Sequence, residues 1–211
     1  MSFTDSPTYG LAKELSSLSK PLIGKSKHHV RNSSDFASSI IHELLQTDEI
    51  MVCFDVVSLF TKVPIQLALN IAKQRLQSDP ELNKRTGLST TDLIKGLEIC
   101  LKFNLLYVSW KTLQTSFWNS NGLPVLSIVA NLVMENIETR ARETFADPPR
   151  LRKRYVDDTF VIMKRSKLSE FLAHLNTIES SIQFTMEKEK EGCLPFLDLL
   201  IKRSLTLGNI S

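Results

Sequence analysis

The stretch that decides the fold is RYVDDTFVI, which runs from Arg154 to Ile162. Its two arms are rich in the β-branched and aromatic residues that favour strands, and the arms meet at Asp157 and Asp158. This pattern predicts a β-hairpin whose turn holds two carboxylates. Aspartate is also a common turn residue because it tolerates turn dihedrals, so the hairpin alone favours an ordinary turn.

A third carboxylate lies in a similar setting about a hundred residues upstream. Asp55 is embedded in the run IMVCFDVV, residues 50–57, which is apolar enough to be a buried strand. A charge in such a strand is costly unless a cation or strong donors compensate it. Carboxylates at the ends of adjacent strands suit Mg²⁺, and two such ions about 4 Å apart clamp the attacking and leaving oxygens of a phosphoryl transfer. We therefore predict a two-metal nucleotidyl-transfer site at Asp55, Asp157 and Asp158.

Composition sets broad limits on the class of protein. With 211 residues, 42% of them hydrophobic and 23% charged, the chain is long enough and apolar enough for a globular core. A net charge of +3 permits a nucleic-acid partner without requiring one. Cys53, Cys100 and Cys193 are far apart and lie among apolar residues, which favours reduced thiols in an intracellular protein. The sequence lacks a run of membrane-span length and a signal peptide, so we expect a soluble protein.

Apolar periodicity along the chain predicts an alternation of helices and strands. Helices are expected over 11–18, 35–46, 64–77, 125–145 and 167–180, and from a capping box at 89–92 to residue 102. The 35–46 helix, capped by Asn32, should bury five apolar side chains: Phe36, Ile40, Ile41, Leu44 and Leu45. Strands are expected at 181–187 and 194–201, and a further hairpin over 105–118. Without the insertion after Asp55, this order is the split β-α-β-β-α-β pattern, whose antiparallel sheet would bring Asp55 beside Asp157 and Asp158.

For two groups of charged or metal-binding side chains, the sequence is compatible with more than one role. The basic run from Arg150 to Arg154 leads directly into the hairpin and could contact phosphates, although a solvated or localisation-type charge run fits almost as well. His28 and His29 could ligate a metal, but no partner residue lies at ligand spacing.

These motifs resemble those of a known family. The YVDD of residues 155–158 resembles the YVDD box of reverse transcriptases, and FDVVSLF, residues 54–60, resembles their first aspartate motif. More narrowly, the chain resembles the reverse transcriptase of Penelope-like retroelements. The supporting stretches are SPTY at 6–9, HVRNS at 29–33, residues 54–64, ANLVME at 130–135, residues 154–162 and LPFLD at 194–198.

The resemblance implies an α+β fold: a right-hand polymerase palm built on a split β-α-β-β-α-β (ferredoxin-like) antiparallel sheet packed on helices, with partial fingers. It implies a helical lead-in over 1–48, a palm core over 49–203 and a tail over 204–211. The implied activity is that of an RNA-directed DNA polymerase. Its partners would be an RNA template, a DNA primer and deoxynucleoside triphosphates, in an intracellular, nuclear setting without a membrane.

Site residues follow from the same resemblance. Asp55, Asp157 and Asp158 would ligate two Mg²⁺ ions, for which Mn²⁺ could substitute. Val56 and Phe60 would contact the nucleotide, with Phe60 in the place of the bulky residue that rejects a ribose 2′-hydroxyl. From the sequence alone, a core phenylalanine is the simpler interpretation of Phe60. The nucleic-acid contacts would come from the end of the basic run and the first residue of the YVDD box: Arg152, Lys153, Arg154 and Tyr155.

Two departures from the family pattern bear on activity. The segment GLPVLSIVA, residues 122–130, lacks the Met-Gly-Ser-Pro that follows Gly-Leu-Pro in the family, and the upstream fingers segment is missing from the sequence. A displacement of about 1 Å can cost roughly 100-fold in rate, and the loss of about four residues is larger, so both departures weaken the expectation of activity. Since the sequence also stops soon after Ile201, we expect the palm core of a truncated or decayed element. The alternative is a catalytically inactive palm remnant that at most binds nucleic acid. A metal-dependent nuclease is a more distant third interpretation, because no residue is evident that would activate water.

Overall fold

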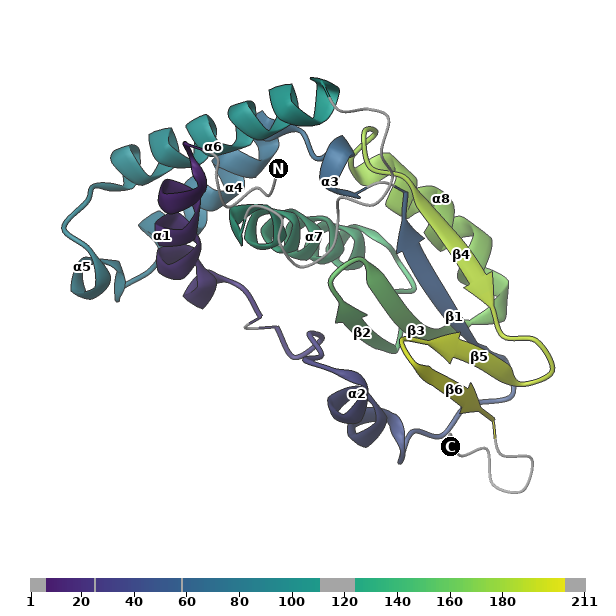
Figure 1. Ribbon diagram of the computed structural model, residues 1–211. Coiled ribbons are helices and arrows are strands. Elements are labelled where there is room, and N and C mark those ends of the chain that lie inside the picture. Colours follow the sequence, from purple (N-terminus) through teal and green to yellow (C-terminus); the bar gives the residue numbers. More distant parts are fainter. Residues whose placement is uncertain (1–6, 25, 58, 111–123, 204–211) are drawn as a thin grey trace. The chain divides into compact units, whose positions relative to one another are not determined.

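The computed structural model describes residues 7–24, 26–57, 59–110 and 124–203 (Figure 1). The chain divides into two compact units, each built from two separate stretches. Unit 1 comprises Met1–Lys25 and Phe60–Asn136, and unit 2 comprises Ser26–Leu59 and Ile137–Ser211. The predicted tail, 204–211, lies outside the described residues.

Unit 1 is helical in the part that the structure describes. It contains α1 (Tyr9–Ser19), the short 3₁₀ helix η2 (Lys20–Leu22), α4 (Ile65–Gln77), α5 (Leu82–Arg85), α6 (Thr90–Trp110) and the first half of α7 (Pro124–Thr144). Both α1 and α4 pack against α6. The contact with α1 is close at Gly96, where an added Cβ would lie 3.1 Å from a methyl carbon of Leu15. The predicted cap at Ser89 is confirmed, since Ser89 Oγ accepts from the Asp92 amide at 3.2 Å. The Asp92 carboxylate accepts from the Ser89 hydroxyl at 2.6 Å, in place of the bond to the Ser89 amide that would complete a capping box.

Unit 2 is built around a four-stranded antiparallel sheet, so the predicted mixed α+β class is confirmed. The strands β1 (Glu49–Val56), β2 (Leu151–Tyr155), β3 (Asp158–Lys164) and β4 (Phe184–Lys188) lie in the order β2-β3-β1-β4. The turn η3 (Arg165–Lys167) and the helix α8 (Leu168–Ile178) connect β3 to β4. The short helix α3 (Leu59–Lys62) follows β1 across the boundary between the two units.

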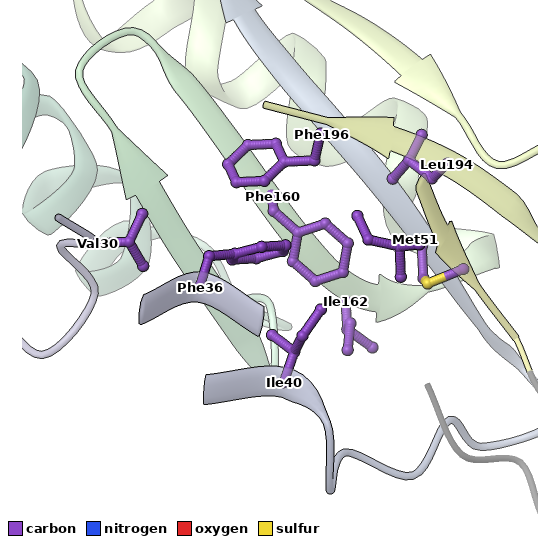
Figure 2. Packing of buried hydrophobic residues seen from close by; sticks show 9 residues of the cluster. Val30, Phe36, Ile40, Met51, Phe160, Ile162, Leu194 and Phe196 are labelled. Atoms are coloured by element: carbon purple, nitrogen blue, oxygen red, sulfur yellow. The ribbon is translucent and has the colours of Figure 1, made fainter. Parts of the chain in front are cut away.

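Each face of the sheet carries its own covering layer. On one face, Phe54 of β1 meets Phe171 of α8 at 5.7 Å between ring centroids, and the second half of α7 adds the buried Ile137 and Ala141. On the other face lie α2 (Ser33–Ile40) and a separate hairpin of β5 (Cys193–Phe196) and β6 (Leu199–Lys202). There Phe36 packs against Phe160 at 5.1 Å and Phe196 at 4.5 Å, as Figure 2 shows. This second layer leaves the end of the sheet that carries Asp55 exposed.

The helix predicted over 35–46 is shorter than expected. It ends at Ile40, and the side chains predicted to be buried at Ile41 and Leu44 are 53% and 57% exposed. The predicted cap is confirmed, because the Asn32 side chain accepts from the Asp35 amide. Two serine hydroxyls near the end bond back to carbonyls of the same helix, Ser38 to Ser34 and Ser39 to Phe36. Such bonds slightly destabilise a helix and favour an early end.

Two strand predictions were wrong. Residues 105–110 continue α6 rather than forming the first arm of a hairpin, and the proposed second arm, 111–118, lies outside the described residues. The apolar run over 194–201 is not one strand but the hairpin of β5 and β6, which folds back at Leu197 with a φ of 54°. Short apolar runs fit helix, strand and folded-back hairpin equally well, so their composition alone does not distinguish these structures.

The three cysteines are free thiols, as predicted, with Cys100 buried and Cys53 and Cys193 half-buried. None of the helices in the described ranges combines the length and the apolar composition that a membrane crossing requires.

Candidate metal and nucleic-acid site

The hairpin of β2 and β3 closes through a two-residue turn made of Val156 and Asp157. Asp158 is already the first residue of β3 and pairs with Tyr155, so only one of the two carboxylates lies in the turn. Val156 has a φ of 54°, the left-handed region that β-branched residues avoid. This conformation costs roughly 1–2 kcal/mol and must be held by its surroundings.

The sheet register brings Asp55 beside this hairpin. The last paired residues of β1 and β3 are Phe54 and Thr159, so the next positions, Asp55 and Asp158, face each other across the two strands. Residues opposite each other in an antiparallel pair share one face, with Cβ atoms about 4.5–5.5 Å apart. Asp55 is exposed, and Asp157 and Asp158 are half-buried. Three carboxylates are therefore gathered at the end of the sheet left uncovered by α2 and the β5-β6 hairpin.

The electrostatics of this end disfavour negative charge. Burial, followed by the charges of Asp157 and Asp55, raises the pKa of Asp158 from 3.8 to about 6. Burial also raises the pKa of Asp157, and the Asp55 carboxylate adds to the effect. Two groups of like charge that face each other in this way are stabilised by a bound cation.

Cys53 and Glu187 lie next to this end, where Cys53 packs against the layer of α2 and the β5-β6 hairpin, and the sequence predicts neither of them as a site residue. Cys53 is two residues before Asp55 on the same face of β1, and Glu187 of β4 is its partner in register. Burial, together with the charges of Asp158, Glu187 and Asp55, raises the pKa of the Cys53 thiol to about 12. The thiol therefore remains protonated at neutral pH, and Glu187 is a fourth carboxylate near the group. The alternation of residues 183–187 could have placed Glu187 on this face, but its partner in β1 depends on a register that the sequence does not specify.

The basic run before the hairpin divides between the two faces of the sheet. Arg152 and Arg154 point to the helix side, where both pair with the buried carboxylate of Glu138 in α7. Arg154 is 1% exposed, so its guanidinium is not accessible to a nucleic acid in this conformation. Lys153 and Tyr155 share the face of Asp158, where Lys153 is half-buried and Tyr155 is 37% exposed. Of the four predicted nucleic-acid contacts, these two are placed to reach a ligand near the carboxylates.

A segment from the start of unit 2 covers the outer edge of β2. The Val30 amide donates to the Arg154 carbonyl at 2.9 Å, and the Arg154 amide donates to the His28 carbonyl at 2.7 Å. His28 Nδ1 lies 3.1 Å from the Arg152 carbonyl oxygen. Through these contacts the segment of His28 and His29 extends the edge of the sheet at β2. In the described part of the chain, no cluster of three His, Cys, Asp or Glu side chains suited to a metal is found, so the predicted histidine ligands gain no partners.

The two predicted nucleotide contacts are less defined. Val56 is 4% exposed and is paired with Phe184, so a contact with a nucleotide would fall to its backbone. Phe60 lies in α3, and its side chain is outside the described residues. Gly122 and Leu123 of the shortened family motif are also outside them, whereas residues 124–130 form the first turns of α7.

The three carboxylates at this end of the sheet offer the ligand type of a hard divalent cation, but in the described part of the chain neither they nor any other three His, Cys, Asp or Glu side chains are grouped so that they could hold a metal ion. Oxygen ligands from carboxylates are those that Mg²⁺ and Mn²⁺ prefer. Among the described residues, Asp55, Asp157 and Asp158 form no ion pair with a lysine or arginine, unlike the carboxylates of Glu49 and Glu138. The charge of Arg154 lowers the pKa of Asp157 and so compensates that carboxylate in part. A ligated cation would remove the repulsion that adds to burial in raising the pKa of Asp158.

No protein-family model matches the sequence, and a comparison with curated proteins gives no match. Among solved structures, the chain is similar to apo telomerase from Candida tropicalis truncated from its C-terminal domain, with a TM-score of 0.58 and 14% sequence identity. The match covers 99% of this chain and 46% of the telomerase chain. The fold is reverse-transcriptase-like. Since the chain spans less than half the length of that structure, the match concerns the fold alone.

Proposed function

We propose that this chain is the palm region of an RNA-directed DNA polymerase of the kind found in Penelope-like retroelements. It would extend a DNA primer with deoxynucleoside triphosphates on an RNA template, with residues 49–203 as the palm core and 1–48 as a helical lead-in. Nuclear residence, where such an element would act, is part of this proposal.

The observation that supports the proposal is the sheet register, in which Asp55 lies opposite Asp158 and Asp157 precedes Asp158 in the turn. Structural carboxylates in this chain are paired, as Glu138 is with Arg152 and Arg154. Asp55 and Asp158 instead face each other, and burial, followed by the charges of Asp157 and Asp55, raises the pKa of Asp158 to about 6. Groups with perturbed pKa values that lie together at an exposed site are candidates for function.

The residues at this end would divide the work of the reaction. Asp55, Asp157 and Asp158 would hold two Mg²⁺ or Mn²⁺ ions, which supply activation of the primer 3′-hydroxyl and charge stabilisation on the transferred phosphate. The rigid strands β1 and β3 would keep these carboxylates in place, because positioning supplies most of the catalysis in phosphoryl transfer. Lys153 and Tyr155, on the same face, would offer a cation to a phosphate and a ring to a base. The backbone at Val56 and the side chain of Phe60 would contact the incoming nucleotide.

Primer extension on an RNA template, with Mg²⁺ and separately with Mn²⁺, tests the proposal. We expect extension by the wild-type chain and a loss of roughly 100-fold or more for Asp157→Asn, because the variant removes a metal ligand. Asp147→Asn is the matched control, since Asp147 is an exposed aspartate of the same unit that pairs with Lys164. It should extend at the wild-type rate.

Three results would contradict a polymerase. A folded wild-type chain that extends nothing with either ion rules out activity for this chain. If it still binds nucleic acid with salt-dependent affinity that Asp157→Asn does not change, the chain is an inactive palm remnant. Metal-dependent shortening of the primer or template, with no extension, would instead indicate a nuclease.

A further inference from the structure

We propose that Arg154 is a positioning residue for Asp157, acting through the carbonyl group of Val156 and held in place by Glu138. The inference rests on the proposed function only in that Asp157 is taken as a metal ligand. It also assigns to Arg154 a role other than the phosphate contact that the sequence predicts.

The side chain of Arg154 connects the helix layer to the hairpin turn. Its Nε donates to Glu138 Oε2 at 3.1 Å, and its Nη1 donates to the Val156 carbonyl oxygen at 2.7 Å. Arg154 is 1% exposed, and Glu138 is 7% exposed. A buried guanidinium requires a carboxylate and further acceptors, and its fixed fork can serve two partners at once.

The Val156 carbonyl belongs to the peptide unit that leads into Asp157. This unit is planar, so fixing the direction of its oxygen also fixes the nitrogen from which Asp157 begins. Val156 itself has a φ of 54°, which a valine adopts only when its surroundings impose it. The hydrogen bond from Arg154 supplies such a restraint at Val156, the residue between the end of β2 and Asp157.

The backbone of Arg154 is held as well. Its amide donates to the His28 carbonyl, and its carbonyl accepts from the Val30 amide. The side chain therefore starts from a fixed point on β2 and ends on a fixed carboxylate of α7. A residue held at both ends can transmit the position of the helix layer to the turn.

Arg152 provides a matched control for this role. It lies two residues earlier on the same face of β2 and pairs with the same carboxylate of Glu138. Its guanidinium also lies close to the Glu138 backbone carbonyl, and no hydrogen bond from it to the turn is present among the described residues. Arg152→Lys and Arg154→Lys both keep the positive charge, but only the second removes the fork that reaches Val156.

The test compares these two variants by three measurements on the full chain. In Arg154→Lys, the backbone amide resonances of 155–158 should shift and their hydrogen exchange should accelerate, while the rest of the spectrum stays unchanged. The dissociation constant for Mn²⁺ should rise about 10–100-fold, the usual effect of losing a group that orients a metal ligand. The salt dependence of binding to an RNA–DNA hybrid should stay at its wild-type slope. Arg152→Lys should leave all three unchanged.

Unchanged hairpin amides in Arg154→Lys would overturn the proposal, and so would equal effects of the two variants. In Arg154→Gln, which removes the charge that lysine keeps, a fall of about one unit in the salt slope would show that Arg154 contacts a phosphate instead. If Arg154→Lys does not fold, Val156→Gly is added, because glycine adopts a positive φ without strain. The double variant should then fold, and its failure to fold would also overturn the proposal. Absence of Mn²⁺ binding by the wild-type chain contradicts the proposed function, whereas the hairpin amides still decide the role of Arg154.

Discussion

Replacing Asp158 with asparagine should stabilise the chain at neutral pH when no divalent cation is present. Asp158 faces Asp55 across β1 and β3, and its carboxyl is half-buried beside Asp157. The pKa of Asp158 is raised from 3.8 to about 6 by burial and by these two charges. Asparagine keeps the shape of the side chain but removes the charge that its surroundings disfavour.

The size of the effect follows from the pKa shift. A rise from 3.8 to about 6 corresponds to roughly 3 kcal/mol, at about 1.36 kcal/mol for each pH unit. Because the carboxyl is only half-buried, solvent screening reduces this to about 1–2 kcal/mol. We therefore expect the free energy of unfolding at pH 7 to rise by about 1–2 kcal/mol in Asp158→Asn.

The sign depends on pH in a defined way. A carboxyl whose pKa is higher in the folded state binds its proton more tightly there, so the folded state gains stability as pH falls from about 6 to about 4. Below the unfolded pKa both states are protonated and the penalty of the charge is gone. The advantage of Asp158→Asn should therefore be full at pH 7 and disappear near pH 4.

Urea denaturation followed by circular dichroism, in the presence of a chelator, measures this difference at the two pH values. Asp92→Asn is the opposite case, because the Ser89 hydroxyl lowers the pKa of Asp92 and its loss should reduce stability at pH 7. A lower free energy of unfolding for Asp158→Asn at pH 7, or an equal gain at pH 4 and pH 7, would refute the view that burial and neighbouring charges disfavour the charged Asp158 carboxylate. Mg²⁺ at 100 times its Kd should stabilise the wild type by about 2.7 kcal/mol and so reverse the order of the two proteins.

Three further changes give distinct readouts. Phe36→Ala should lower the free energy of unfolding by about 3–5 kcal/mol, because Phe36 is fully buried between Phe160 and Phe196, and a lower urea midpoint would measure it. Asn32→Ala removes the cap of α2 and should cost about 1 kcal/mol in the same experiment, with Asn32→Ser restoring most of it. Lys153→Gln should reduce the salt slope of nucleic-acid binding by about one unit, and an unchanged slope would place the ligand elsewhere.

Local signals in the sequence account for much of unit 2. The β-branched arms of the RYVDDTFVI stretch form β2 and β3, and the run around Asp55 forms β1 between β3 and β4. The caps at Asn32 and at Ser89 could also be predicted, because a cap depends on a few neighbouring side chains. Where one face of a strand is buried, its alternation also indicates which side chains share that face.

The two wrong strand predictions concern segments whose structure depends on contacts with residues far away in the sequence. The run of residues 194–201 is apolar enough for one strand, but it folds back so that Phe196 can meet Phe36 of α2. Similarly, the apolar residues over 105–110 fit a strand, and α6 nevertheless extends through them. Such runs are assigned by tertiary packing, which overrides local preference.

At the candidate site, too, some features follow from neighbouring residues and others depend on residues far away in the sequence. The three aspartates could be predicted to meet, because their strands and the sheet order follow from the pattern. The charge of the basic run does not indicate which of its side chains are buried and which are exposed. Alternation along β2 places Arg152 and Arg154 on one face and Lys153 and Tyr155 on the other, a period-two signal that was present in the sequence. Which face is buried under Glu138 depends on α7, and no residue near the run indicates it.

The central position of β1 has a consequence for synthesis of the chain on the ribosome. Its two neighbours in the sheet, β3 and β4, both come later in the chain, and β3 begins roughly 100 residues after β1 ends. At translation rates of about 5–20 residues per second, β1 waits on the order of 5–20 s before a partner emerges. During that time Ile50, Met51 and Val52 present an unpaired apolar strand to the solvent. This interval, rather than any step of the later folding, is when the nascent chain is most exposed to aggregation and most in need of a chaperone.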